Sequence, residues 1–430
     1  MTLWNDYGFR ENPYSTKAIP PTEEGAYLLV GRAGEAKRLH RLITSSDTHP
    51  TIEGANGVGK TSLVQVTAYI AKRGAETKRT GQVFLPLSEV FQMTPTSDPE
   101  TFRQSVLYAV VRGFDTHYRT LKESGLAVPD HKAVHRWLHS PLFHGGGVSV
   151  TGVGGNRSTA PNATAGFAED GFAATVTQWL STCFPSPQAG GFVCVLDNLE
   201  LLETSHSART FLETIRDSLL NIPGLKWVLC GARGIVRSAA ASPRLNGVLG
   251  DPMELGPIST ADVPELVGRR IDCYAINDDF LLPVDDLGFL LIYKLLNHNL
   301  RDALKQCEAF SFWLDESGHT PSTLATHRLL RGWLDEHARG FQEAARSVKP
   351  KAWMVFDKLI EMGGTCSPGD HENFGFKTSM AMRPHVKDLE DANLVSSTID
   401  DRDQRRKTIS ISSPGWLVRY ARFQEKNAES

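Results

Sequence analysis

The sequence of 430 residues predicts an α/β fold with a parallel sheet, followed by a helical segment and a smaller mixed segment. Three observations predict this arrangement. A glycine-rich loop follows a short apolar stretch near residue 50, and apolar strands then alternate with amphipathic helices, as they do in parallel sheets. From about residue 258 the pattern becomes helical, and the last 80 residues combine two helices with two polar strands.

Two segments lead up to the glycine-rich loop. Residues 7–21, YGFRENPYSTKAIPP, mix aromatic, proline and charged residues, which predicts an ordered extended arm and no helix. Residues 28–43, LLVGRAGEAKRLHRLI, are a short apolar run followed by an amphipathic helix.

The loop itself has the spacing of a Walker A motif, Gly54-x-x-x-x-Gly59-Lys60-Thr61. Glycine permits the backbone angles that turn successive N–H groups inward, where they can hold the β-phosphate of a nucleotide. The following helix directs its positive dipole end to the same place. Lys60 can reach the β- and γ-phosphates, and the Thr61 hydroxyl can bind Mg²⁺. The predicted nucleotide contacts in this loop are Gly54, Ala55, Asn56, Gly57, Val58, Gly59, Lys60, Thr61 and Ser62.

Strand and helix patterns alternate after the loop. Residues 81–90 predict a second strand and 97–114 a helix. The stretch 190–203 contains a strand apolar on both faces that ends at Asp197, 208–222 predict a helix, and 224–234 contain another buried strand. Residues 143–167 are rich in Gly, Ser, Thr and Asn, and predict a mobile loop or flexible hairpin that is either a linker or a contact for nucleic acid.

The strand VCVLD ends in Asp197, which predicts the second Mg²⁺ site residue, a Walker B carboxylate. Asn198 follows, where many ATPases place glutamate. An asparagine can orient a water molecule but cannot accept its proton, and a general base contributes ~10²–10⁴ in rate. The sequence therefore predicts slow hydrolysis, with Glu200 as an alternative base or a simple helix-start charge.

Composition limits the other classes of function. The net charge of −3 excludes a strongly basic protein, so any DNA contact must come from a local patch. The six cysteines are scattered without a CxxC pair, which favours reduced thiols. The first 25 residues lack the apolar core of a signal peptide, and no apolar run approaches ~20 residues, so we expect a soluble cytoplasmic protein without a membrane partner.

The motifs in this order resemble the AAA+ ATPases, and within them the origin-recognition and replication-licensing initiator ATPases and their bacterial relatives. The matching stretches are FRENPY (9–14), LVGRAGE (29–35), the P-loop, residues 242–271 and HNLRDALK (298–305). The resemblance implies a P-loop NTPase core with a parallel sheet, an α-helical lid and a C-terminal winged-helix domain. It also implies ATP and Mg²⁺ as cofactors, and a homo-oligomer with ATP at the subunit junctions.

The resemblance also assigns roles to single residues. The backbone of Val30, Gly31 and Arg32 would lie against adenine. Arg301 would be the sensor-2 arginine, Arg244 the finger that reaches a neighbour's nucleotide, and Arg233 would occupy the sensor-1 position. Two departures stand out, because Asn198 replaces the usual glutamate and the family often has Asn where Arg233 stands, as in signalling ATPases of the STAND group.

The implied domains are a core at 1–256 that includes the arm and the 143–167 insertion, a lid at 257–320, a linker helix at 321–349 and a winged helix at 350–430. The helix near 350–362 would bury Trp353, Val355, Phe356, Leu359 and Ile360, and the helix near 377–390 would be the recognition helix, with Val386, Leu389 and Leu394 in the core. A recognition helix contacts DNA through its N-terminal part. The predicted double-stranded DNA contacts are Lys377, Thr378, Ser379 and Arg383 on that helix and Arg402, Arg405, Arg406 and Lys407 on the wing.

His131, His135 and His139 recur at a spacing of four on one predicted helical face. Two histidines at this spacing can share a metal. No acid or cysteine partner is evident in the sequence, so we favour a solvated or packing stripe.

Three functions remain open at this point. The first is an ATP-binding, slowly hydrolysing AAA+ ATPase that assembles with ATP and engages DNA through the winged helix. The second is a STAND-like signalling or anti-phage defence ATPase switch that recruits an effector protein, with a winged helix that binds no DNA. The third is a loader that acts on partner proteins.

Overall fold

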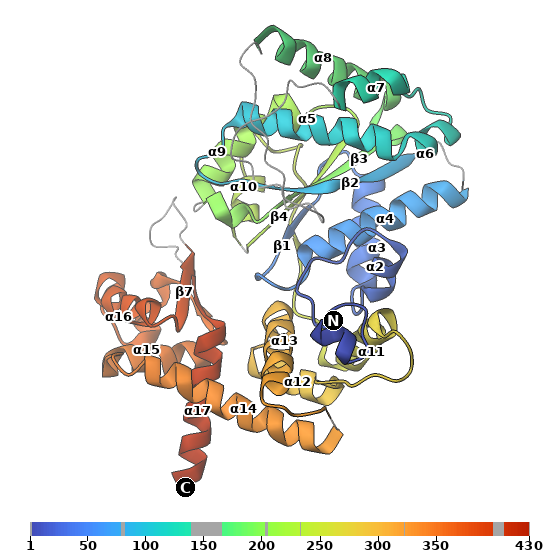
Figure 1. Ribbon diagram of the computed structural model, residues 1–430. Helices are drawn as coiled ribbons and strands as arrows, with labels where there is room; N and C mark the ends of the chain where they lie inside the picture. The colour runs from blue at the N-terminus through green and yellow to red at the C-terminus, as the bar shows by residue number, and fades with distance from the viewer. Residues whose placement is uncertain are drawn as a thin grey trace. The chain divides into compact units, whose positions relative to one another are not determined.

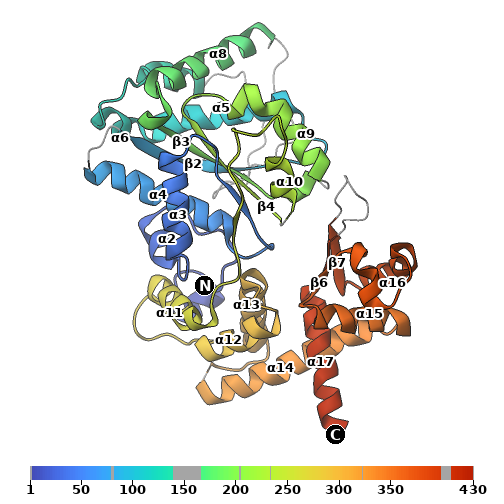
Figure 2. The same cartoon turned by 180° about the vertical axis from the view of Figure 1, so that it is seen from behind.

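The computed structural model describes residues 2–78, 82–138, 166–202, 205–232, 234–321, 323–398 and 408–429. They form two compact units, shown from opposite sides in Figures 1 and 2. The sheet unit comprises Ala18–Ala55 and Gly59–Gly256. The helical unit comprises Met1–Lys17, Asn56–Val58 and Pro257–Ser430.

The sheet unit is built on five parallel strands in the order β2-β3-β4-β1-β5. The strands are β1 (Thr51–Glu53), β2 (Val83–Gln92), β3 (Gly190–Asp197), β4 (Leu225–Gly231) and β5 (Met253–Glu254). Every residue of β3 and β4 is buried, as their continuous apolar sequences predict. The predicted α/β fold with a parallel sheet is therefore confirmed.

Helices cover both faces of this sheet. In Figure 1, α4 (Lys60–Lys78) lies on one face with α3 (Ala33–Ser45) and α2 (Glu23–Leu28), and α5 (Pro99–Thr116) and α8 (Gly166–Cys183) lie on the other. The remaining helices of the unit are α6 (Tyr118–Glu123), α7 (His131–Leu138), α9 (Ser205–Ile215), α10 (Ile235–Ala240) and the short turns at Pro187–Ala189, Leu199–Leu202 and Arg216–Leu220.

The main core lies between the sheet and α5, α8 and α9. Alternate residues of β2, β3 and β4 face it, such as Phe192, Cys194 and Leu196 of β3. The ring of Phe114 on α5 meets Phe192 edge-on, with 5.0 Å between the ring centroids. This packing holds the amino-terminal part of β3, the strand whose carboxyl end carries Asp197.

The helical unit begins with α1 (Leu3–Asp6) and the arm, and continues with α11 (Val263–Tyr274), α12 (Asp286–Leu295), α13 (Leu300–Glu316) and α14 (Thr323–Ala344), preceded by a turn at Thr260–Asp262. The arm contains no helix over residues 7–21, as predicted. The buried Arg270 guanidinium donates to the carbonyls of Pro13 (2.9 Å) and Ser15 (3.2 Å), and the Tyr14 hydroxyl donates to the Val284 carbonyl (2.6 Å). The arm is thus packed on helices that follow it by about 250 residues of chain.

The C-terminal segment of the helical unit has α15 (Pro350–Glu361), a turn at Pro368–Phe374, α16 (Ser379–Asp391) and α17 (Ser413–Glu429). Its antiparallel sheet has the order β6-β8-β7, from Thr365–Cys366, Thr408–Ile411 and Val395–Thr398. The two predicted helices and two predicted strands are present. Three further elements were not predicted: the turn, β6 and α17 (Figure 2). Helix α17 packs on α14, and the Tyr420 hydroxyl donates to Asp335 at 2.7 Å.

Two of the predicted core residues of this segment are only half buried. Val355, Phe356, Leu359, Val386, Leu389 and Leu394 are buried, but Trp353 and Ile360 are not fully enclosed. The reason for Trp353 is the unpredicted helix α17, whose Arg422 places its guanidinium 4.4 Å from the centre of the indole ring and pairs with Asp357. Trp353 therefore lies beneath an ion pair instead of in the apolar core.

The described helices include none that is long and apolar enough to cross a membrane. The six cysteines are all free thiols, and burial raises the pKa of Cys183 to about 12.

A buried histidine beside β1 leads to a prediction about pH. His49 Nε2 lies 2.7 Å from the Leu220 carbonyl, and its Nδ1 accepts from the Trp227 N–H at 3.2 Å, so the neutral ring with a proton on Nε2 satisfies both contacts. Burial lowers the pKa of His49 to about 4. An unfolded histidine titrates near ~6.5, so below that pH the unfolded chain binds more protons than the folded chain does. The contribution of His49 to stability is therefore complete above pH ~6.5 and decreases as the pH falls to ~4. We expect the protonation of His49 in the unfolded chain to lower the free energy of unfolding by about 2 kcal/mol between pH 7 and pH 5.

Urea denaturation at pH 7 and pH 5 measures this loss. The variant His49→Gln can still donate to the Leu220 carbonyl but does not titrate, so its loss should be smaller than that of wild type by about 2 kcal/mol. Equal losses in the two proteins would contradict the assignment.

Candidate nucleotide site

The loop between β1 and α4 requires glycine at two positions. Gly57 has φ +83° and Gly59 has φ +94°, in the left-handed region that side chains disfavour. At Gly57 a Cβ would also lie 2.5 Å from the Asn299 side-chain oxygen. The Gly54 N–H donates to the Gly231 carbonyl at 3.2 Å, and this bond fixes the start of the loop to the end of β4.

Lys60 lies inside the curve of this loop. Its side chain is only 5% exposed, and its ammonium group donates to the carbonyls of Gly54 (2.9 Å) and Ala55 (3.1 Å). The charge is therefore held by loop backbone and lies at the end of the loop where a phosphate would bind. It is not part of the apolar core.

Thr61, at the start of α4, and Asp197, at the end of β3, come together although the strand before Thr61, β1, is not a neighbour of β3. Strand β4 lies between β1 and β3, yet the Thr61 hydroxyl donates to Asp197 Oδ2 at 2.5 Å. Asp197 is buried, and its second oxygen, Oδ1, has no partner among the described residues. A hydroxyl beside a buried, half-satisfied carboxylate is a donor set that suits Mg²⁺. The residues therefore fit the predicted metal.

The residues after Asp197 turn sharply toward β4. Asn198 has φ +55°, a conformation that asparagine tolerates better than most residues. Glu200 Oε2 accepts from the Ala232 N–H at 2.9 Å, and its Oε1 is buried without a partner among the described residues. Glu200 thus joins the ends of β3 and β4 and has one carboxylate oxygen free.

A third carboxylate, Glu53, was not identified from the sequence. It is fully buried at the end of β1, and accepts from the Arg237 guanidinium and from the Gly234 N–H at 3.4 Å. The only available signal was an acidic residue that interrupts an apolar strand directly before Gly54. Arg233, the predicted sensor-1 residue, lies outside the described residues, but the N–H groups on either side of it are held by Glu200 and Glu53.

The turn predicted to contact adenine, Val30–Arg32, is held in place by the Arg32 side chain. Val30 and Arg32 are buried, and Gly31 has φ +67°. The Arg32 guanidinium donates to Glu35 (3.0 Å) and to the Gly256 carbonyl (2.6 Å). The Arg32 side chain thus holds the start of α3 to Gly256, which follows β5. The contact of this turn's backbone with adenine stays a prediction.

In the helical unit, the start of α13 contacts the loop residues Asn56 and Gly57. Asn299 caps α13 by accepting from the Asp302 N–H, and its side-chain amide donates to the Asn56 carbonyl at 3.2 Å. The Arg301 N–H donates to the Gly57 carbonyl at 3.3 Å. The exposed Arg301 side chain therefore begins next to Gly57, and Asn299, which was not predicted from the sequence, holds the start of α13 against Asn56.

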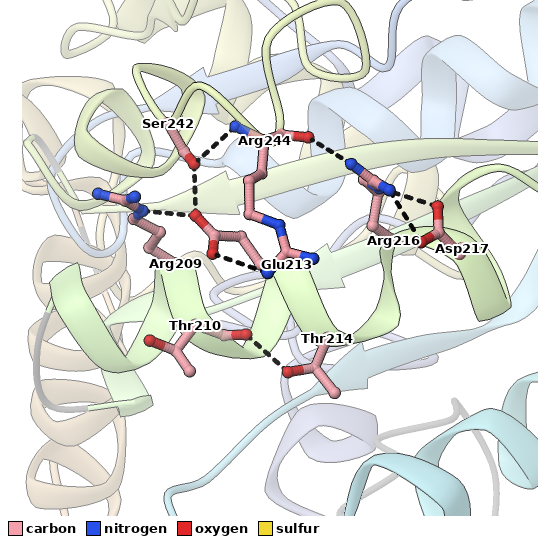
Figure 3. A network of polar contacts seen from close by, with 8 residues as sticks. All are labelled: Arg209, Thr210, Glu213, Thr214, Arg216, Asp217, Ser242 and Arg244. Carbon is pink, nitrogen blue, oxygen red and sulfur yellow. Dashed lines mark hydrogen bonds and ion pairs between the residues drawn. The ribbon is translucent and has the colours of Figure 1, made fainter.

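Arg244 lies on a loop of the sheet unit that is held by a polar network (Figure 3). Glu213 accepts from the Ser242 hydroxyl (2.5 Å) and from Arg209 (2.6 Å), and these two bonds lower the pKa of its carboxyl. Arg216 donates to the Arg244 carbonyl at 3.2 Å. The Arg244 side chain itself is 64% exposed, and its guanidinium is 3.9 Å from Glu213. The backbone is fixed while the charged end is available to another molecule.

The predicted DNA contacts lie partly outside the described residues, where Arg402, Arg405, Arg406 and Lys407 fall. Lys377 and Arg383 are exposed at the start of α16, and Ser379 is half buried. The Thr378 hydroxyl caps α16 by accepting from the Ala381 N–H at 3.2 Å. Thr378 thus holds the end of the helix that is predicted to meet phosphate.

The sheet, the glycine loop, the buried lysine and the threonine–aspartate pair together define the P-loop class of nucleotide-binding folds. No family model matches the chain, and no curated protein matches it. Among solved structures, the chain is similar to the Aeropyrum pernix ORC1 protein in complex with DNA, with 15% identity, a TM-score of 0.46 and coverage of 97% of both chains. It is also similar to the Aeropyrum pernix ORC2 protein (12%, 0.46, 96% and 99%) and to Thermotoga maritima RuvB (13%, 0.37, 89% and 92%).

These proteins include the origin-recognition kind that the sequence motifs resemble.

Proposed function

We propose that the chain binds ATP with Mg²⁺ at the P-loop, hydrolyses it slowly, and assembles with other copies when ATP is bound. The observation that carries the proposal is the contact between Thr61 and Asp197, which leaves one buried carboxylate oxygen without a partner. Mg²⁺, when bound, would neutralise charge on the phosphates. Lys60 would exchange its loop carbonyls for phosphate oxygens. Arg301 would act as the sensor-2 arginine that the resemblance implies.

Slow turnover follows from the residue after Asp197. Asn198→Glu should raise the rate of ATP hydrolysis, by up to ~10²–10⁴, if a missing general base limits it. Asn198→Gln is the matched control, because it has the same length and the same backbone strain but cannot accept a proton. Brisk wild-type turnover that is lost in Glu200→Gln would instead identify Glu200 as the base, through the oxygen that Ala232 does not occupy.

We further propose that the C-terminal segment is a winged helix that engages double-stranded DNA. Support comes from the exposed Lys377 and Arg383 at the capped end of α16, together with the four basic residues between β7 and β8. Such a surface would meet phosphates through its charges, and Arg383, the fifth residue of α16, would read a base edge.

A salt titration of duplex binding tests the DNA proposal. Each phosphate contact contributes about −0.9 to the log–log slope of affinity against salt, so changing Arg405, Arg406 and Lys407 to Ala should flatten the slope by up to about three units. Changing the exposed α3 residues Lys37, Arg38 and Arg41 to Ala removes the same charge and should leave the slope unchanged. Binding should tighten with a non-hydrolysable ATP analogue, because assembled copies bind one duplex at several points. Equal slopes for the wing variant and wild type would exclude the wing.

One observation favours the alternative, a signalling switch that recruits an effector protein. Met380 is 80% exposed in the first turn of α16, between the predicted DNA contacts Ser379 and Arg383. An exposed methionine suits an adaptable protein contact better than a phosphate backbone. Absence of duplex binding at low salt with the analogue present would favour this switch over the DNA proposal.

A further inference from the structure

Two helices of the sheet unit bring three metal-binding side chains together, away from the P-loop residues. Asp115 lies near the C-terminal end of α5, and His131 and His135 lie one turn apart on α7. The Nε2 atoms of His131 and His135 are 3.2 Å and 3.6 Å from Asp115 Oδ1. One ligand atom from each residue lies within 4.8 Å of the other two. The acidic partner that the sequence did not reveal is therefore Asp115, and His139 lies outside the described residues.

The separations match those of a metal site. Ligand atoms bound tetrahedrally to Zn²⁺ at ~2.0–2.1 Å lie about 3.3–3.4 Å apart. The two nitrogen–oxygen distances lie on either side of this value, so only a small rotation of the imidazole rings toward each other is needed. We propose that Asp115, His131 and His135 bind one Zn²⁺ ion, with the fourth position open to water.

The backbone that carries these donors is already fixed. Val134, between the two histidines, is fully buried in the main core, and so is Phe114 beside Asp115. The His131 ring packs against Tyr118, with 4.8 Å between the ring centroids. The donor side chains themselves are between one third and one half exposed, so an ion can reach them from solvent.

The chemistry of the donor set favours zinc over magnesium or calcium. Imidazole nitrogens suit Zn²⁺, whereas Mg²⁺ and Ca²⁺ prefer oxygen ligands. Two neutral imidazoles and one carboxylate also leave a net charge of −1 to compensate a divalent cation. The ion would join α7 to the end of α5, and this role is independent of ATP binding.

The test uses the full chain with any histidine tag removed and metals stripped by a chelator. Zn²⁺ is titrated against a chromophoric chelator, and thermal unfolding is followed with and without Zn²⁺. We expect one equivalent of Zn²⁺ per chain at submicromolar affinity and a higher Tm in its presence. Co²⁺ substitution should give the intense visible absorption of a tetrahedral site.

Three variants, Asp115→Asn, His131→Gln and His135→Gln, should each weaken Zn²⁺ binding by at least ~100-fold, since loss of a direct ligand should exceed the ~10–100-fold cost of an outer-shell change. His206→Gln removes an exposed histidine from α9 and should change nothing. All substituted side chains are exposed or partly exposed, and Tm without metal verifies folding. Zn²⁺ binding that is absent at micromolar concentration, or that survives in Asp115→Asn, would overturn the proposal.

Discussion

The variant Lys60→Ala is expected to lose ATP binding while the sheet unit stays folded. The Lys60 ammonium contacts the loop carbonyls of Gly54 and Ala55 and is enclosed by backbone. A bound triphosphate would place its negative charge in the same enclosed space. Truncating one partner of a buried, hydrogen-bonded charge pair costs ~2–5 kcal/mol, which is a ~30- to 5,000-fold loss of affinity.

Titration with a fluorescent ATP analogue measures this loss, and circular dichroism with thermal unfolding verifies the fold. Lys72→Ala is the matched control, because Lys72 lies on the same helix and pairs with Glu76 at 3.8 Å. It should bind ATP like wild type. A folded Lys60→Ala protein with unchanged affinity would refute the P-loop assignment.

The parts of the fold that could be predicted are those encoded by local patterns. Strands β3 and β4 are continuous apolar runs because both of their faces are covered by helices, and such runs are visible in the sequence. Strand β6 has two residues and pairs with β8 about 43 residues later, so no local periodicity marks it. Helix α17 contains Pro and Gly in its first turn, two residues of low helix propensity, and it is stabilised by contacts with α14, such as the Tyr420–Asp335 bond.

The candidate site divides in the same way. Lys60, Thr61 and Asp197 could be named because spacing within a loop, or an acid at the end of a strand, is local information. Glu53 and Asn299 could not, since their roles depend on contacts across 181 and 243 residues of chain. Asp115 shows the same limit, because its proximity to two histidines follows from the packing of α5 and α7.

The variant Arg244→Ala is expected to lose ATP hydrolysis, because Arg244 would act on the nucleotide that a neighbouring copy of the chain binds. An arginine supplied in trans to a phosphoryl-transfer site contributes ~10³–10⁵ in rate. Arg244 meets the physical requirement for this role: its backbone is fixed by Ser242 and Arg216, while its side chain is 64% exposed. Its 3.9 Å contact with Glu213 is a surface pair worth ~0–1 kcal/mol, so Arg244→Ala should fold normally and bind ATP.

Mixing two inactive variants distinguishes a finger in trans from a local role. Arg244→Ala subunits bind ATP but lack the finger, and Lys60→Ala subunits lack ATP but keep Arg244. In a random equimolar mixture of head-to-tail assemblies, about a quarter of the junctions combine an intact P-loop with an intact Arg244. ATP turnover should therefore recover to a measurable fraction of wild type, whereas mixing either variant with itself should not restore it. Arg119→Ala, at an exposed arginine on α6, should keep full activity. If the mixture stays inactive and every protein remains monomeric with ATP, Arg244 does not act on a neighbour's nucleotide, because no junction then exists at which it could.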